Sequence, residues 1–203
     1  MKRKPQAVWA IGLVASALIL GSSGAAAAAS TPPNGPGPRS HYTVQKQPAA
    51  HHCHYRYTKS QPLPDQHCTP GALNPKVTQA TLAATICHAG YTTTIRPPTS
   101  ITNKEKLANA KSYSYVGRLN FAEYDHLVSL ELGGDPNDSR NLWVEPPSPG
   151  HKTNSGVHNP KDTVENRAKS LVCKHEVLLN VMQRAIATNW VTALAAVGHP
   201  TGR

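Results

Sequence analysis

Asp125-His126 is the pair of adjacent residues in this sequence best suited to chemistry. The Asp125 carboxylate offers oxygen atoms, which hard divalent cations prefer as ligands. The imidazole of His126 belongs to the side-chain type that exchanges a proton near neutral pH, so it can activate water. A bound metal ion can polarise a phosphoryl oxygen and stabilise the leaving oxygen. The pair therefore predicts hydrolysis of a phosphodiester bond.

Three further polar segments follow this pair along the chain. Gly133-Gly134 predicts a turn, because glycine adopts positive φ without strain. Asn141-Leu142 opens a short run that predicts a return strand. Segment 158–162 predicts the start of a helix, with Asn159 as the capping residue and Pro160 at the first helical position. The order is therefore strand, turn, strand and helix.

Asp125-His126, Gly133-Gly134 and Asn141-Leu142 together resemble the signature of the HNH, or ββα-metal, endonucleases, over about residues 118–172. The resemblance implies that His126 is the general base and that Asp125 is a metal ligand. It also implies that Asn141 holds the loop and orients the His126 ring by a hydrogen bond. The Cys pairs that bind a structural zinc in many such domains are absent.

The same resemblance implies a further metal ligand at the start of the helix. His158 fits this position, and Asn159 is the alternative. Lys161, Asp162 and Glu165 are candidates for contacts around the metal's own ligands. The implied cofactor is a divalent ion, Mg²⁺, with Mn²⁺ or Zn²⁺ as alternatives. The implied substrate is DNA or RNA with little base specificity, since no groove-reading element is visible.

A longer series of segments is similar to small exported bacterial proteins that are described as hypothetical or HNH-like. This wider similarity indicates a family more than an activity. The segments are 68–72, 85–87, 125–127, 141–143, 161–165 and 183–190.

The N-terminus has the three parts of a secretory signal peptide, which we assign to residues 1–29. A basic start is followed by an apolar run from Ala7 to Leu20 and then by small residues, with cleavage expected near Ala28 or Ala29. About 20 residues are needed to cross a bilayer, so the run is too short for stable membrane insertion. A secreted, extracellular protein is expected.

Charge favours a polyanionic partner. The full chain has 21 Lys and Arg residues and 11 Asp and Glu residues, and three of the basic residues lie in the signal. The mature chain keeps 18 basic and 11 acidic residues, a net charge of +7. Such an excess favours nucleic acid or an anionic envelope polymer, although solubility alone is the simpler explanation. No protein partner can be inferred.

Four cysteines remain after the signal: Cys53, Cys68, Cys87 and Cys173. An even number in an exported chain predicts two disulfides rather than a zinc site. Three connectivities are possible, and the sequence does not decide between them. We favour Cys68–Cys87, a short loop worth about 3 kcal/mol, which leaves Cys53 to pair with Cys173.

The mature chain divides into a Pro-rich disordered spacer, residues 30–65, and one HNH-like α+β domain, residues 66–203. The expected fold is a small ββα-metal hairpin-helix unit packed with additional helices and stapled by disulfides. Periodicity and breakers predict helices at 75–87, 103–112, 159–172 and 176–197, and strands at 91–95, 118–132 and 141–144.

Two other functions compete with a nuclease. His126 is in phase with Val128, Leu130 and Leu132, so it could be a core histidine. The domain could then be a non-catalytic module that binds nucleic acid or an anionic envelope polymer. It could also be a purely structural domain in which an Asp125–His126–Asn141 cluster braces the hairpin.

Overall fold

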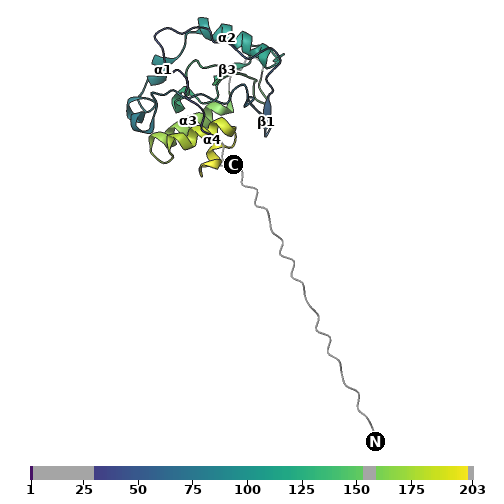
Figure 1. The fold of residues 1–203 in the computed structure, drawn as a ribbon, viewed down its shortest axis with the longest axis vertical. Helices are drawn as coiled ribbons and strands as arrows, with labels where there is room; N and C mark the ends of the chain where they lie inside the picture. The colour runs from purple at the N-terminus through teal and green to yellow at the C-terminus, as the bar shows by residue number, and fades with distance from the viewer. Residues whose placement is uncertain (2–29, 153–158, 201–203) are drawn as a thin grey trace.

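The computed structural model describes Met1, residues 30–152 and residues 159–200 (Figure 1). The predicted signal peptide, except for Met1, lies outside the described residues, and so does His158. The disulfide-stapled α+β class is confirmed. Helices, strands and two 3-10 helices (η) occur in the order β1 Arg56–Thr58, β2 Gln61–Leu63, η1 Gln79–Ala84, α1 Tyr91–Ile95, α2 Thr99–Ser112, β3 Glu123–His126, η2 Leu130–Leu132, β4 Leu142–Glu145, α3 Pro160–Cys173, α4 Leu179–Asn189 and α5 Ala193–Ala196.

The centre of the domain is a two-stranded antiparallel hairpin, β3 and β4, which lies between α2 and α3 (Figure 1). His126 is paired with Leu142 at one end of the hairpin. The edge of β4 is covered by Asn109 of α2, whose Oδ1 accepts a hydrogen bond from the Val144 N–H at 2.8 Å. Because Asn109 occupies hydrogen-bonding groups that a third strand would use, this short sheet has a protected edge.

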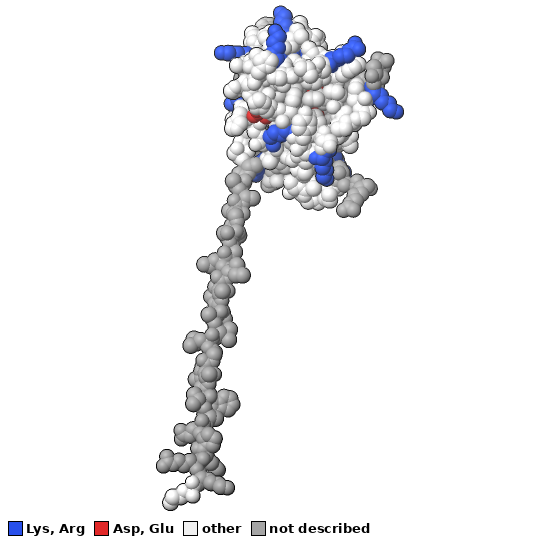
Figure 2. Space-filling view, turned by 90° about the vertical axis from the view of Figure 1, so that its right-hand side faces the viewer, with Lys and Arg blue, Asp and Glu red and all other residues white. Residues whose placement is uncertain are grey.

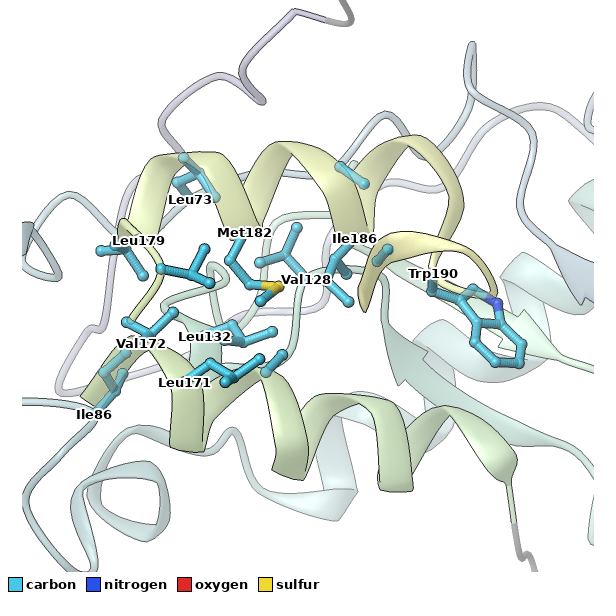
Figure 3. Packing of buried hydrophobic residues seen from close by; sticks show 14 of the residues in the cluster. Leu73, Ile86, Val128, Leu132, Leu171, Val172, Leu179, Met182, Ile186 and Trp190 are labelled. Atoms are coloured by element: carbon cyan, nitrogen blue, oxygen red, sulfur yellow. The ribbon is translucent and has the colours of Figure 1, made fainter. Parts of the chain in front are cut away.

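Apolar side chains fill the space between α3 and α4 (Figure 3). Leu171 and Val172 of α3 face Met182 and Ile186 of α4, and all four are fully buried. Each such side chain contributes about 1.5–3 kcal/mol when it leaves water. This core fixes α3, and with it the N-terminal turn of α3 beside the hairpin.

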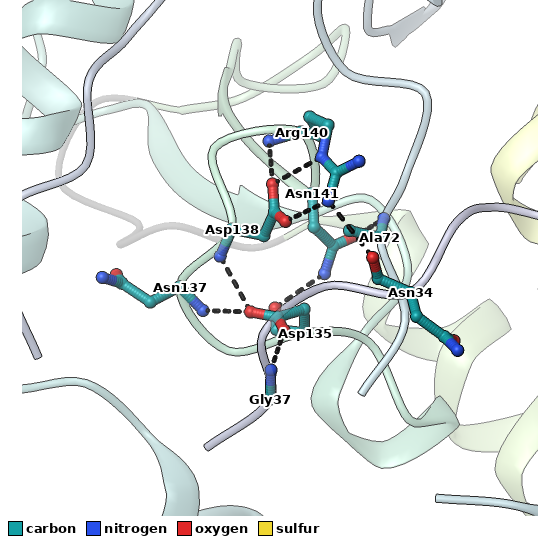
Figure 4. Close-up of polar contacts among 8 residues, drawn as sticks. All are labelled: Asn34, Gly37, Ala72, Asp135, Asn137, Asp138, Arg140 and Asn141. Atoms are coloured by element: carbon teal, nitrogen blue, oxygen red, sulfur yellow. Dashed lines mark hydrogen bonds and ion pairs between the residues drawn. The ribbon is translucent and has the colours of Figure 1, made fainter. Parts of the chain in front are cut away.

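The loop between η2 and β4 is closed by buried polar groups (Figure 4). Both side-chain groups of Asn141 bind backbone: Nδ2 donates to the carbonyls of Val128 and Asp135 at 3.0 Å, and Oδ1 accepts from the Val128 N–H at 3.0 Å. Asp135 Oδ2 accepts from the Gly37 N–H at 2.7 Å. A Cβ at residue 134 would lie 1.7 Å from the Val128 carbonyl oxygen, so Gly134 is required there.

Residues 30–65 are not a disordered spacer, and that prediction is wrong. The segment contains β1 and β2 and packs on the domain, where Cys53 and Leu63 are buried. Gly35 donates its N–H to the Leu73 carbonyl at 2.8 Å. The segment has little periodicity because its one sheet, β1 paired with β2, is only three residues long on each strand and long-range contacts hold the rest.

Several predicted elements differ from those observed. Segment 91–95 is the helix α1 rather than a strand, so tertiary contacts override the β-propensity of its threonines. The predicted strand 118–132 is reduced to β3 and η2, and the helix predicted at 75–87 is reduced to η1. The last predicted helix is divided into α4 and α5. In the part of the chain that the structure describes, no helix is both long enough and apolar enough to cross a membrane.

The disulfides are Cys53–Cys68 and Cys87–Cys173, so the favoured pairing was wrong. The favoured pairing rested on the short loop between Cys68 and Cys87, but the observed Cys53–Cys68 disulfide closes a loop that is also short, with a sequence separation of 15. The fold instead brings Cys173, at the end of α3, beside Cys87, across a sequence separation of 86. Cross-links over long loops restrict the unfolded chain more strongly.

Asp65 offers a test of the N-terminal packing. Its carboxylate accepts hydrogen bonds from the N–H groups of His54 and His67, both at 2.8 Å. Burial alone raises the Asp65 pKa, but these donors outweigh it and hold the pKa below the ordinary value. Such a carboxylate stabilises the fold above its unfolded pKa, and the contribution is lost as the pH falls through the folded pKa.

We expect Asp65→Asn to lower the free energy of unfolding at pH 7 by about 1–2 kcal/mol, because an amide oxygen accepts more weakly than a carboxylate. The difference from wild type should shrink below about pH 4. Urea unfolding at pH 7 and pH 3 measures both values, with the exposed Glu176→Gln as the control. An equal difference at both pH values would contradict this account.

Candidate active site at the hairpin and the start of helix α3

His126, the last residue of β3, is buried with its ring fixed by one hydrogen bond. Nε2 lies 3.0 Å from the carbonyl oxygen of Pro136. A carbonyl can only accept, so Nε2 carries the proton and Nδ1 carries the lone pair. Among the described residues nothing hydrogen-bonds to Nδ1. The imidazole is therefore held in the tautomer that a base requires.

Burial keeps this imidazole neutral. Loss of hydration lowers the His126 pKa to about 4, although the Pro136 carbonyl and the Asp125 carboxylate oppose the shift. The positive charges of Arg96 and Lys161 lower the pKa further. At neutral pH the ring is therefore unprotonated, and the same low pKa makes it a weaker base than a histidine in water.

Lys161, in the first turn of α3, joins the helix to the end of β3. Its side chain is 1% exposed, and Nζ lies 2.7 Å from Asp125 Oδ2 and 2.8 Å from the His126 carbonyl oxygen. Nζ also pairs with Glu165 one turn along the helix. Burial alone lowers the Lys161 pKa, but Asp125 and Glu165 outweigh it and raise the pKa. The ammonium therefore stays charged in the interior.

More carboxyl groups than one ammonium can neutralise surround Lys161. Burial raises the pKa of Glu123 to about 7, and it raises the pKa of Glu165 although the Lys161 ammonium opposes that shift. Burial also raises the pKa of Glu145 well above its ordinary value, and the neighbouring Asp125 carboxylate adds to this. Protons on Glu123 and Glu145 lower the negative charge of the cluster near neutral pH, while Asp125 and Glu165 remain the ion-pair partners of Lys161.

A pocket of about 320 Å³ opens beside this cluster. His126 lines it, together with Arg96, which directly follows α1, and with residues of β3, η2 and α3. Of the described residues in the lining, Arg96 is the one Lys or Arg side chain. The lining also contains five acidic side chains: Glu123, Asp125, Glu131, Asp162 and Glu165.

Adjacent residues of a strand point to opposite faces, which raised the question of how Asp125 and His126 could serve one site. Both line the pocket. Glu123 and Tyr124 line it as well, so every residue of β3 contributes to this pocket.

Asn141 lies in the loop, as the resemblance implied, but its side chain binds backbone. The hydrogen bond to the His126 ring comes from the Pro136 carbonyl instead. Because Asn141 and Pro136 belong to the same closed loop, Asn141 acts on the ring only through that loop. The implied direct hydrogen bond is not formed.

Asn159, the alternative ligand predicted at the helix start, has a capping role instead. Asn159 is the N-cap of α3, and its Oδ1 accepts from the Lys161 N–H at 3.1 Å. The capping prediction for Asn159-Pro160 is therefore confirmed. Asp162 lines the pocket, whereas Lys161 and Glu165 are paired with each other. His158 lies outside the described residues.

The described side chains do not fit the implied metal centre. No group of three or more His, Cys, Asp or Glu residues in ranges 30–152 and 159–200 is arranged to hold a metal ion. The Lys161 ammonium lies against Asp125 Oδ2, where it repels a second cation and already supplies the positive charge. The divalent ion remains a prediction of the resemblance, and no chemical step is assigned to it.

No protein-family model matches the sequence, and no curated protein or solved structure matches it either. The chemistry of the pocket must therefore be inferred from its own residues. Three groups at the site had no signal in the sequence: Arg96 in the pocket lining, the Pro136 carbonyl that holds the His126 ring, and Glu145 beside Asp125. The sequence predicts Lys161 only as a contact around the metal ligands, because Asp125 and the His126 carbonyl, which it binds, lie on a distant strand.

Lys161→Met tests the buried ion cluster. We expect a loss of about 3–5 kcal/mol in the free energy of unfolding, because Asp125 and Glu165 would remain buried without their cation. Adding Asp125→Asn and Glu165→Gln to this variant should recover part of the loss, since the unpaired charges disappear. Urea unfolding at pH 7 measures each step.

Lys104→Met, on the exposed face of α2, is the matched control and should change stability by no more than about 0.5 kcal/mol. If Lys161→Met were as mild as this control, Lys161 would not join α3 to the hairpin in the way described.

Proposed function

We propose that this chain is a secreted endonuclease of the ββα type, which hydrolyses phosphodiester bonds with His126 as the general base. The observation that carries the proposal is the state of His126: a neutral ring, fixed through Nε2, that lines a pocket and has no partner at Nδ1 among the described residues. A histidine kept only for packing needs neither the pocket nor an available lone pair.

The chemistry follows from this state of the ring. Nδ1 of His126 takes a proton from a water molecule in the pocket as the water oxygen forms a bond to phosphorus. The bond from phosphorus to the leaving oxygen breaks, and the leaving oxygen takes up a proton from His126 or from solvent. The Asp125 carboxylate favours the imidazolium that forms between these events.

Lys161 and the closed loop position the base. Lys161 holds the His126 carbonyl at 2.8 Å, and the Pro136 carbonyl holds the ring at 3.0 Å. The backbone and the side chain of the base are thus fixed by two different elements, α3 and the loop. Such fixing reduces the entropy that the reaction must lose on reaching its transition state.

The substrate and the location are supported by charge and covalent structure. The basic excess of the mature chain favours a polyanion such as DNA or RNA. Figure 2 shows Lys and Arg side chains spread over one face, with little acidic surface among them. The two disulfides are in accord with an exported chain, and the three-part N-terminus supports cleavage of a signal peptide near Ala28 or Ala29.

A structural domain is the second candidate, because the buried Lys161 cluster braces the hairpin against α3. Bracing does not account for a free lone pair in a pocket. The two candidates differ in outcome, since a structural domain leaves nucleic acid intact, and a non-catalytic binding module binds it in a salt-sensitive manner without cleavage.

The first test is cleavage of supercoiled plasmid by the purified mature protein, without metal and with Mg²⁺, Mn²⁺ or Zn²⁺. We expect nicking by wild type and a loss of about 100-fold or more in His126→Ala, because a general base contributes about that much. The exposed His88→Ala should retain the wild-type rate.

His126→Gln separates the loss of the base from the loss of the fold, since its amide N–H can still donate to the Pro136 carbonyl. It should be folded and inactive. The nuclease function is ruled out if wild type and both His126 variants are equally inert in every metal condition.

Metal binding has its own test, the melting temperature of the mature protein with and without each ion. From the described residues we expect no shift, because Lys161 occupies the cation position beside Asp125. An ion at 100 times its Kd would add about 2.7 kcal/mol of stability. A clear rise that His158→Ala abolishes would show instead that His158 completes a metal site with Asp125.

A further inference from the structure

Arg96 lies at the pocket but has no role in the reaction proposed above. It follows α1 directly and is exposed, yet it lines the same pocket as His126. Its positive charge lies close enough to His126 to disfavour protonation of the imidazole. The guanidinium is therefore near the base and open to solvent.

Three of the five acidic side chains in the pocket pair with lysines. Asp125 and Glu165 both pair with Lys161, and Glu131 lies 3.7 Å from Lys169. Across the described residues, no carboxylate forms an ion pair with Arg96. The five N–H donors of Arg96 are therefore not used in an ion pair with these carboxylates and can bind an anion from outside.

The backbone that carries Arg96 is held in place although its side chain is not. Ile95 is 6% exposed, and its carbonyl accepts a hydrogen bond from the Tyr42 hydroxyl at 2.5 Å. The Cys87–Cys173 disulfide ties the chain ahead of α1 to the end of α3, the helix that forms the opposite side of the pocket. Arg96 is thus presented at a fixed place relative to His126.

We propose that Arg96 is the anion receptor of this pocket and binds the phosphodiester group that is to be cleaved, whether in DNA or in RNA. The inference rests on the proposed hydrolase function and names the group that receives its substrate. The planar guanidinium donates two parallel hydrogen bonds to the non-bridging phosphate oxygens, which places phosphorus beside the pocket that His126 lines. The same contacts accommodate the charge that develops on those oxygens during attack.

The test compares a charged ligand with a neutral one of the same shape. The mature protein is titrated with the dinucleotide TpT and with its methylphosphonate counterpart, in which a methyl group replaces one charged oxygen. Binding is followed by NMR, so that no turnover is required. We expect wild type to bind TpT about tenfold more tightly than the neutral analogue, the usual effect of a charged hydrogen-bonded pair.

Arg96→Gln should bind the two dinucleotides with equal affinity, and Arg96→Lys should restore part of the preference as a point charge. Arg167→Gln is the matched control, because Arg167 is exposed on α3 and does not line the pocket; it should keep the wild-type ratio. Repeating the titration with UpU decides whether the ribose changes the affinity and thus separates RNA from DNA.

The proposal is overturned if Arg96→Gln keeps the tenfold preference, or if wild type shows none. Failure of the hydrolase function has a different signature. Wild type would then leave plasmid intact in every condition while the preference for TpT still depended on Arg96, and the pocket would be a phosphodiester-binding site without cleavage.

Discussion

The buried ammonium of Lys161 is the interaction on which the rest of the site depends. It joins Asp125 and the His126 carbonyl of β3 to Glu165 of α3. Such a cation is costly to bury, and it stays charged only because carboxylates surround it. Those carboxylates would in turn be unpaired without it. Lys161 therefore holds the β3–β4 hairpin and helix α3 together as one structural unit.

Two other arrangements make that unit rigid. The apolar core between α3 and α4 fixes the helix that carries Lys161 (Figure 3). The loop closed by Asn141 and Asp135 fixes the Pro136 carbonyl that holds the imidazole (Figure 4). The position of one ring nitrogen is thus determined by packing on one side and by hydrogen bonds on the other.

The sequence predicted best where local chemistry decides the structure. The Asn159-Pro160 helix start, the β4 strand and the α+β class are signalled by a cap, a proline and short hydrophobic runs. It failed where distant contacts decide, as in residues 30–65, the threonine-rich α1 and the pairing of Cys87 with Cys173. The site shows the same division. The Asp125-His126 pair identified His126 from the sequence. Arg96, and Asp125 as a partner of Lys161, reach the site from elements that only the fold brings together.

The Cys87–Cys173 disulfide has a consequence for where the site can exist. Its two ends enclose α1, the hairpin, the closed loop and the start of α3, so every residue assigned a role in the pocket lies inside one covalent ring. In a reducing compartment that ring is open, and α1 with Arg96 is tied to α3 by non-covalent contacts alone. Oxidation of this pair therefore stabilises the whole pocket at once, because one cross-link restricts every segment that contributes to it.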